Sequence, residues 1–141
     1  MSRLLCAFCV MVIAGGVSAN EAAVQALKDY RAGQGRAALG YSPALEAAAR
    51  AHAQDMARVG FFDHTGSDGS TVGQRVTRQG YGWCFVAENI AQGQRSLAEV
   101  MQGWADSRGH RRNMLSRQAT EFALVEGPAR IWVMVLAAPG C

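Results

Sequence analysis

The feature that most constrains the fold is an alanine-rich helix predicted over residues 43–59. Ser42 and Pro43 favour a helix start, because a serine side chain caps the free amides of the first turn and proline suits the first helical position. Gly60 is typical of a helix end. One face of this helix carries Leu45, Ala48, Ala49, His52, Met56 and Val59. Because alanines permit close approach, we expect the helix to pack tightly against a neighbour, with His52 as a buried histidine bonded to the backbone or to an acid.

Helix and strand patterns alternate along the rest of the chain. Helices are predicted over residues 22–31 and 70–79. A further helix begins at Ser96, is broken at Gly109 and is followed by a short helical turn through Leu115. Strands are predicted over residues 83–91, 121–125 and 131–137. Turn residues at 126–129 predict a hairpin between the last two strands. This order favours an α+β domain with a small antiparallel sheet covered by helices, and it argues against a sandwich of sheets or a barrel.

The N-terminal segment has the pattern of a secretory signal. Arg3 precedes an apolar run at 4–17, and small residues follow where a signal peptidase would cut. The run is short for a permanent membrane span. We therefore predict a cleaved signal at 1–19, one domain at 20–141, a secreted or periplasmic location and no transmembrane anchor after cleavage. The alternative is a retained N-terminal anchor.

Net charge and cysteine content bear on the expected partners and on the expected disulfide. The net charge is +3, and loss of Arg3 with the signal would leave +2. The basic residues are scattered, so no nucleic-acid partner is expected. Loss of the signal would also leave two of the four cysteines, Cys84 and Cys141. One pair in an exported protein predicts a single disulfide, with two free thiols as the alternative.

Three separated segments carry side chains that could form one site. They are Phe61-Phe62-Asp63-His64-Thr65-Gly66, Ala87-Glu88-Asn89-Ile90 and Gly109-His110-Arg111-Arg112-Asn113-Met114-Leu115. Two imidazoles, from His64 and His110, with the carboxylate of Glu88 could hold a divalent metal or move protons. Taken locally, each also has a structural explanation, as a surface histidine, an exposed edge-strand acid and a histidine at a helix C-terminus. The long spacings alone do not decide between these interpretations.

The same segments, together with residues 45–57, resemble the bacterial CAP superfamily, named after cysteine-rich secretory proteins, antigen 5 and pathogenesis-related 1 proteins. The resemblance covers residues 22–137. It implies an α-β-α sandwich, export, and a cleft lined by two histidines and acidic residues that binds zinc or another divalent ion in some members. His64 and Glu88 match the family's histidine and glutamate, and His110 matches the bacterial Gly-His-Arg motif. Ser107 stands where eukaryotic members often have a second glutamate, so water could complete a metal site.

Two functions follow as hypotheses. The favoured hypothesis is an exported, non-enzymatic protein that acts at the cell envelope or outside the cell. Its cleft would bind a ligand such as a lipid, a partner, or a divalent metal ion, with zinc as the first candidate. The alternative is a metal-dependent, peptidase-like hydrolase in which His64 and His110 hold the ion and Glu88 orients or deprotonates a bound water. The sequence shows no complete nucleophile and base set, which favours binding.

Overall fold

The computed structural model describes residues 18–141. Its helices are α1 (Ala19–Gly33), α2 (Pro43–Val59), α3 (Val72–Arg78), α4 (Leu97–Asp106) and α5 (Arg108–Met114). Its strands are β1 (Gly40–Tyr41), β2 (Trp83–Gln92), β3 (Glu121–Gly127) and β4 (Ile131–Pro139). The predicted signal lies outside the described residues apart from Ser18, which caps α1, and Ala19, where that helix begins.

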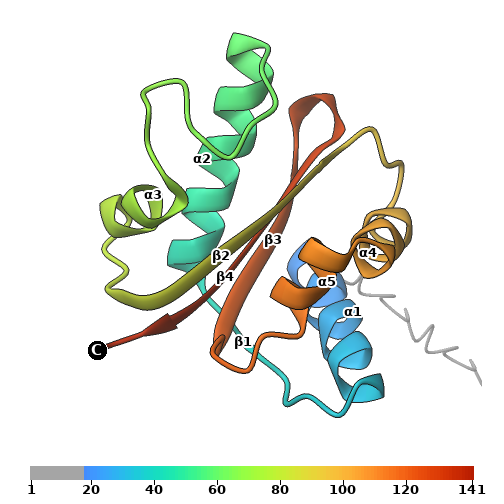
Figure 1. Ribbon diagram of the computed structural model, residues 1–141. Coiled ribbons are helices and arrows are strands. Elements are labelled where there is room, and N and C mark those ends of the chain that lie inside the picture. The colour runs from blue at the N-terminus through green and yellow to red at the C-terminus, as the bar shows by residue number, and fades with distance from the viewer. Residues whose placement is uncertain (1–17) are drawn as a thin grey trace, which may run out of the picture.

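The strands form one sheet in the order β1-β3-β4-β2. β4 pairs antiparallel with both β2 and β3, and β1 pairs parallel with β3. Figure 1 shows α2 and α3 on one face of the sheet and α1, α4 and α5 on the other. The prediction of an α-β-α sandwich of the α+β class is therefore confirmed. The sheet is mixed rather than purely antiparallel, because β1 pairs parallel with β3. This two-residue strand was not predicted.

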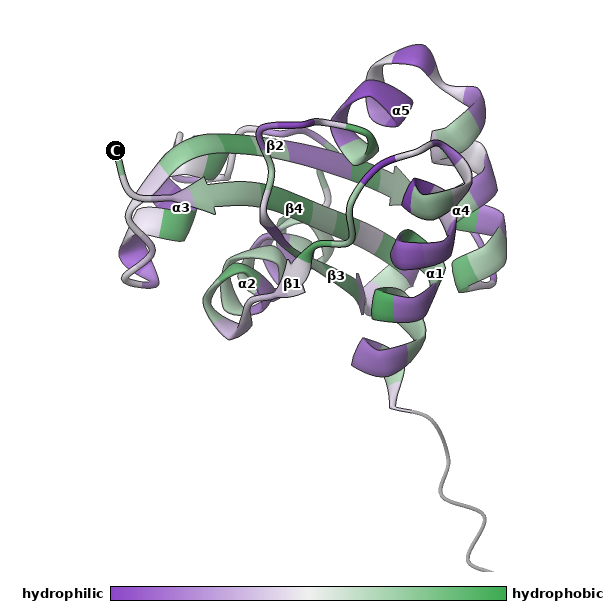
Figure 2. Cartoon of the chain, turned by 90° about the horizontal axis from the view of Figure 1, so that it is seen from below, coloured by the Kyte–Doolittle hydropathy of each residue, from purple (hydrophilic) through white to green (hydrophobic). Residues whose placement is uncertain are grey.

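The sheet separates two apolar cores. One core joins α2 and α3 to the sheet, and the other joins α1, α4 and α5 to its opposite face. Figure 2 shows apolar residues along the central strands and polar residues on outward turns of the helices. The expected tight packing of α2 is confirmed, since a Cβ placed on Gly127 would lie 2.6 Å from the Cβ of Ala53. His52 is buried, as predicted, but Val59 at the end of α2 is 51% exposed and does not join the buried stripe.

Most predicted elements are present, with one correction beside the site. The break after the Trp104 helix falls at Ser107, whose backbone is extended, and Gly109 lies inside α5. β3 and β4 form the predicted hairpin, and the link between them is a 3₁₀ turn, Pro128–Arg130. Cys84 and Cys141 form the predicted disulfide, which ties the end of the chain to β2. Within residues 18–141, no helix is both long and apolar enough to cross a membrane.

Candidate functional site

The site is built on the edge strand β2, where two polar neighbours face opposite layers. Successive residues of a strand point to opposite faces of the sheet. Val86 and Ile90, which alternate with Glu88, belong to the core under α2 and α3, whereas Phe85 and Ala91 pack against the other layer. Glu88 thus faces α2 and α3, and its neighbour Asn89 faces α4 and α5. Both residues are buried.

Glu88 is the centre of a buried polar network. Its Oε1 lies 2.8 Å from Nδ1 of His64, and its Oε2 accepts a 2.8 Å hydrogen bond from Nη2 of Arg75. Only 2% of the Glu88 side chain and 8% of the Arg75 side chain are exposed. Arg75 also donates to the carbonyl of Ser70. Both carboxylate oxygens are therefore occupied, as burial of a charge requires.

The three histidines differ in their electrostatics. The hydrogen bond to Glu88 raises the pKa of His64. Burial lowers the pKa of His52, although its Nε2 lies 3.9 Å from Glu88, and desolvation outweighs the nearby carboxylate. Burial, and then the charge of His64, lowers the pKa of His110. His64 is thus the histidine of this group that most favours a proton.

The contact with Glu88 fixes the orientation of His64. Because a carboxylate accepts hydrogen bonds, Nδ1 of His64 donates, and Nε2 is left without a protein partner among residues 18–141. The side chain is 55% exposed. In its neutral form this ring offers a lone pair on Nε2, and in its charged form it offers a second N–H. A carboxylate–histidine pair of this kind orients ligands in metal sites and bases in hydrolytic sites.

Asn89 holds α5, on the opposite face of the sheet, against β2. Its Nδ2 donates to the carbonyl of His110 at 3.1 Å, and its Oδ1 accepts from Asn113 at 2.9 Å. Asn113 also reaches the carbonyl of Glu88, and the indole of Trp104 donates to the carbonyl of Ile90. An edge strand leaves such backbone groups open. Here side chains from α4 and α5 bind them, which fixes His110 beside β2.

A cleft of about 480 Å³ lies along this edge. Phe62, Trp104, Ser107 and His110 contribute to its lining, together with the end of β2. The rings of Trp104 and His110 are 6.4 Å apart and tilted. Neither Glu88 nor His64 is among the lining residues, but His64 follows Phe62 by two residues and lies near enough for its charge to lower the pKa of His110. The structure thus brings His64 and Glu88 into contact and places His110 in the cleft wall.

The side chains available as donors limit how a metal ion could be bound. Within residues 18–141, no group of three or more Cys, His, Asp or Glu side chains is arranged to hold an ion. Glu88 is engaged by Arg75, so the candidate donors that remain are Nε2 of His64 and the ring of His110. A divalent ion there would have two imidazole ligands and would need water or ligand atoms to complete its shell.

Arg75 is the functional residue that sequence reasoning missed. It lies in a helix of seven residues with ordinary polar neighbours, 13 positions before its partner. A buried acid in an apolar strand does signal that some partner exists. It does not identify that partner, because the contact depends on how α3 packs against β2.

Comparison with known proteins agrees with this geometry. A sequence model described as "CAP: Cysteine-rich secretory protein family" matches residues 24–126. The chain belongs to this family. It is 34% identical over 109 residues to the uncharacterized protein YkwD of Bacillus subtilis, with 77% of this chain and 42% of YkwD covered. The CAP domain described here therefore spans less than half the length of that relative.

Solved structures show the same fold at low identity. An extracellular protein from Bacillus anthracis that contains an SCP domain superposes with a TM-score of 0.76 at 23% identity, over 88% of this chain and 45% of that one. An outer surface protein of Borrelia burgdorferi superposes with a TM-score of 0.75 at 18% identity, over 83% of this chain and 90% of that one. The likeness to these extracellular and surface proteins establishes the CAP fold.

Proposed function

We propose that this CAP domain is an exported, non-enzymatic binding protein that acts at the cell envelope or outside the cell. The observation that carries the proposal is the buried Glu88, whose two oxygens are used to hold His64 and Arg75. The network fixes an exposed imidazole beside a cleft lined by Phe62 and Trp104. This arrangement fits recognition of a ligand and includes no activated nucleophile.

The chemistry of the cleft favours an amphiphile with an acidic head. Aromatic and aliphatic side chains supply an apolar wall. His64, whose pKa is raised by Glu88, supplies a positive charge beside the cleft when it is protonated. Binding of laurate, followed by calorimetry, should be tighter at pH 6 than at pH 8, and His64→Ala should remove this difference. A laurate affinity that is independent of both pH and His64, or no saturable binding at all, would contradict the proposal.

A divalent metal is the second candidate ligand. His64 through Nε2 and His110 would hold it, and a bound ion would polarise a coordinated water or carboxylate. We expect zinc titrated into the mature protein to bind weakly and to lose most of its affinity in His64→Ala and His110→Ala. His52→Gln, which changes a buried histidine outside the cleft, is the matched control. Equal zinc affinity in all four proteins would exclude this site.

The hydrolase alternative makes a different demand on Glu88. A base must reach the proton that it removes, and both oxygens of Glu88 are already bound to His64 and Arg75. This favours binding over hydrolysis. A screen of peptides and esters with the zinc-loaded protein tests it directly. Turnover that disappears in Glu88→Gln at unchanged zinc affinity would establish the enzyme instead.

A further inference from the structure

A hollow of about 380 Å³ lies at the edge of the sheet opposite β2, where β1 and β3 begin. Its lining comes from the end of α1, the loop between α1 and β1, and the loop between α5 and β3. The two loops lead into the paired starts of the parallel strands β1 and β3, and Figure 1 shows them at the same end of the sheet. The volume falls within the range of about 300–1,000 Å³ that is common for ligand sites.

Three arginines line this hollow, and no acidic residue lines it with them. They are Arg31 of α1, Arg36 of the first loop and Arg117 of the second. None of the three pairs with a carboxylate among residues 18–141, where the arginines in ion pairs are others. Glu121, which follows the second loop, faces the core under α2 and α3, where Tyr81 donates to its carboxylate. The charge of this hollow is therefore uncompensated.

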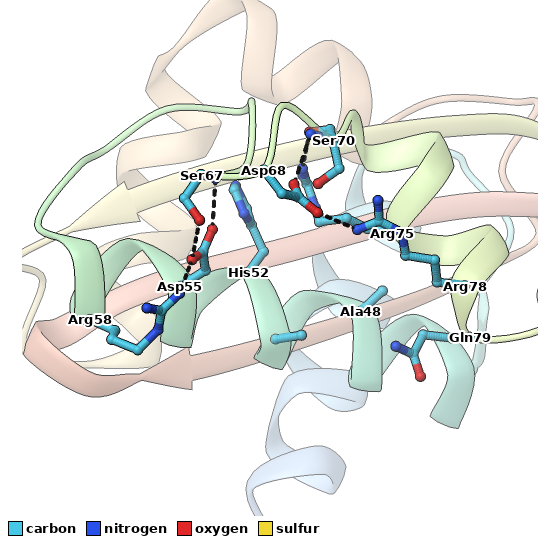
Figure 3. Close-up of a pocket in the computed structure, with 11 residues that line it drawn as sticks. Ala48, His52, Asp55, Arg58, Ser67, Asp68, Ser70, Arg75, Arg78 and Gln79 are labelled. Carbon is cyan, nitrogen blue, oxygen red and sulfur yellow. Dashed lines mark hydrogen bonds and ion pairs between the residues drawn. The ribbon is translucent and has the colours of Figure 1, made fainter.

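The hollow between α2 and α3 shows the opposite arrangement. It is also lined by three arginines, but each of them pairs with a carboxylate. The pairs are Arg58 with Asp55 at 2.8 Å, Arg78 with Asp68 at 2.6 Å and Arg75 with Glu88 at 2.8 Å. Figure 3 shows the first two of these pairs. Because its charges neutralise one another, that hollow has no charge with which to select an anion.

The buried Arg31 still has free hydrogen-bond donors. Its Nε donates to the carbonyl of Ala37, and its Nη1 donates to the carbonyls of Met114 and Ser116. These bonds use three of the five N–H groups of the guanidinium. The two on Nη2 have no partner among residues 18–141, and Nη2 is not fully buried. Because Arg31 is only 2% exposed and lines the hollow, Nη2 is the atom through which it meets a ligand there.

Arg36 and Arg117 add donors on the open side of the hollow. Arg36 uses only its Nε, which donates to the carbonyl of Leu115. Arg117 is exposed. Burial, and then the charge of Arg36, lowers the pKa of Arg31, so the two guanidinium groups lie close enough to repel each other. An anion between them relieves this repulsion, and the planar donor groups of arginine suit the oxygens of a phosphate.

We propose that the hollow lined by Arg31, Arg36 and Arg117 binds a phosphomonoester group. Nη2 of Arg31 donates to the phosphate from the buried side, and Arg36 and Arg117 donate from the open side. Three positive charges favour a dianion over a carboxylate or another monoanion. This site lies at the opposite edge of the sheet from the cleft at His110, and it does not depend on the acidic amphiphile proposed for that cleft.

The first test is calorimetry of the mature protein at low salt with glycerol 3-phosphate, and with glycerol as the uncharged control. A phosphomonoester gains its second charge above about pH 6, and the titratable side chains that line the hollow are arginines, which stay charged. Glycerol 3-phosphate should therefore bind more tightly at pH 8 than at pH 5. Sulfate, a dianion throughout this range, should bind with no such change. The cleft has the opposite pH dependence, because it uses the charge of His64.

Four variants locate the site. Arg117→Gln removes one of the three charges and should weaken binding of glycerol 3-phosphate about tenfold. Arg130→Gln, the matched control, removes the same charge at an exposed position beyond the far end of β3 and should bind like the wild type. Ala38→Glu places a carboxylate in the hollow and should abolish binding. His64→Ala should retain wild-type affinity for glycerol 3-phosphate, which separates this test from that of the cleft.

Vesicles distinguish two sources of the phosphate group. Phosphatidylcholine vesicles with and without phosphatidic acid, sedimented with the protein, measure binding to a phosphomonoester headgroup. Binding of glycerol 3-phosphate alone assigns a soluble ligand, and vesicle binding that is lost in Arg117→Gln assigns a headgroup. Either assignment supports the site.

Three results would overturn the phosphate site. These are no saturable binding of glycerol 3-phosphate at low salt, equal affinities in Arg117→Gln and Arg130→Gln, or tighter binding at pH 5 than at pH 8. The last result would assign the phosphate to the charge of His64 instead of the arginines.

Discussion

Replacing Glu88 by glutamine tests whether the buried network holds the site together. The substitution keeps the shape of the side chain and removes its charge. Arg75 would then be left in the interior without a counter-ion, since its other bond goes to the carbonyl of Ser70. His64 would lose the carboxylate that raises its pKa. The variant therefore changes stability through Arg75 and the proton affinity of the site through His64.

The expected loss of stability follows from the burial of the pair. Removing one partner of a buried ion pair destabilises a protein by about 3–5 kcal/mol, because the remaining charge is uncompensated. The Glu88 and Arg75 side chains, 2% and 8% exposed, fall in this class. A small domain has a total stability of about 5–15 kcal/mol, so Glu88→Gln should fold but be much less stable. The double variant Arg75→Met, Glu88→Gln removes the uncompensated charge and should recover part of the loss.

Urea unfolding measures this loss, with Glu46→Gln as the matched control. Glu46 also pairs with an arginine, but the side chains of Arg50 and Glu46 are 48% and 21% exposed, so its loss should cost about 0–1 kcal/mol. An NMR titration should show the pKa of His64 falling toward its ordinary value in Glu88→Gln and not in Glu46→Gln. Equal destabilisation by the two substitutions, or an unchanged His64 titration, would refute the reasoning.

Three further predictions concern the frame of the site. Reduction of the Cys84–Cys141 disulfide, which closes a loop with a sequence separation of 57, should lower the free energy of unfolding by about 4 kcal/mol in urea with and without reductant. Gly127→Ala should lower it by about 1–3 kcal/mol in the same assay, because the added methyl group meets Ala53. The raised pKa of His64 stabilises the fold fully below the unfolded value of about 6.5, and this contribution is lost as pH rises through the folded pKa. The stability difference between wild type and His64→Gln should therefore shrink from pH 5 to pH 9.

The parts of the fold that were predictable carry local signals. The bounds of α2 match the prediction because Ser42, Pro43 and Gly60 specify both ends within a few residues. The strand β1 was missed because two residues carry no period, and their pairing with β3 is a long-range contact. The break at Ser107 was placed at Gly109, since glycine is the stronger local signal, while the turn depends on how α4 and α5 pack.

The residues of the candidate site were more predictable from the sequence than the contacts between them. The local explanation of Glu88 as an exposed edge-strand acid is wrong, because α2 and α3 cover its face of the strand and bury it. The resemblance placed His64 beside it, and the structure shows that contact. Arg75 could not be predicted, because any basic residue of a neighbouring helix would satisfy the same requirement. That Nδ1 of His52 is buried without a hydrogen-bond partner among residues 18–141 is likewise a property of packing.

The register of β2 determines that Glu88 faces one helical layer and Asn89 the other. Glu88 opposes Val135 and Asn89 opposes Met134 on the central strand β4. A slip of one residue would turn every β2 side chain to the other face. The amide of Asn89 would then face Arg75, and the charge of Glu88 would enter the apolar layer beside Trp104. Such a slip leaves two charges unpaired and buries apolar residues wrongly, so the contacts that orient His64 and hold α5 also specify the register. His64 and His110 come from opposite layers, and the charge of His64 lowers the pKa of His110. They lie at the same edge because each contacts one of two adjacent residues of β2, Glu88 and Asn89.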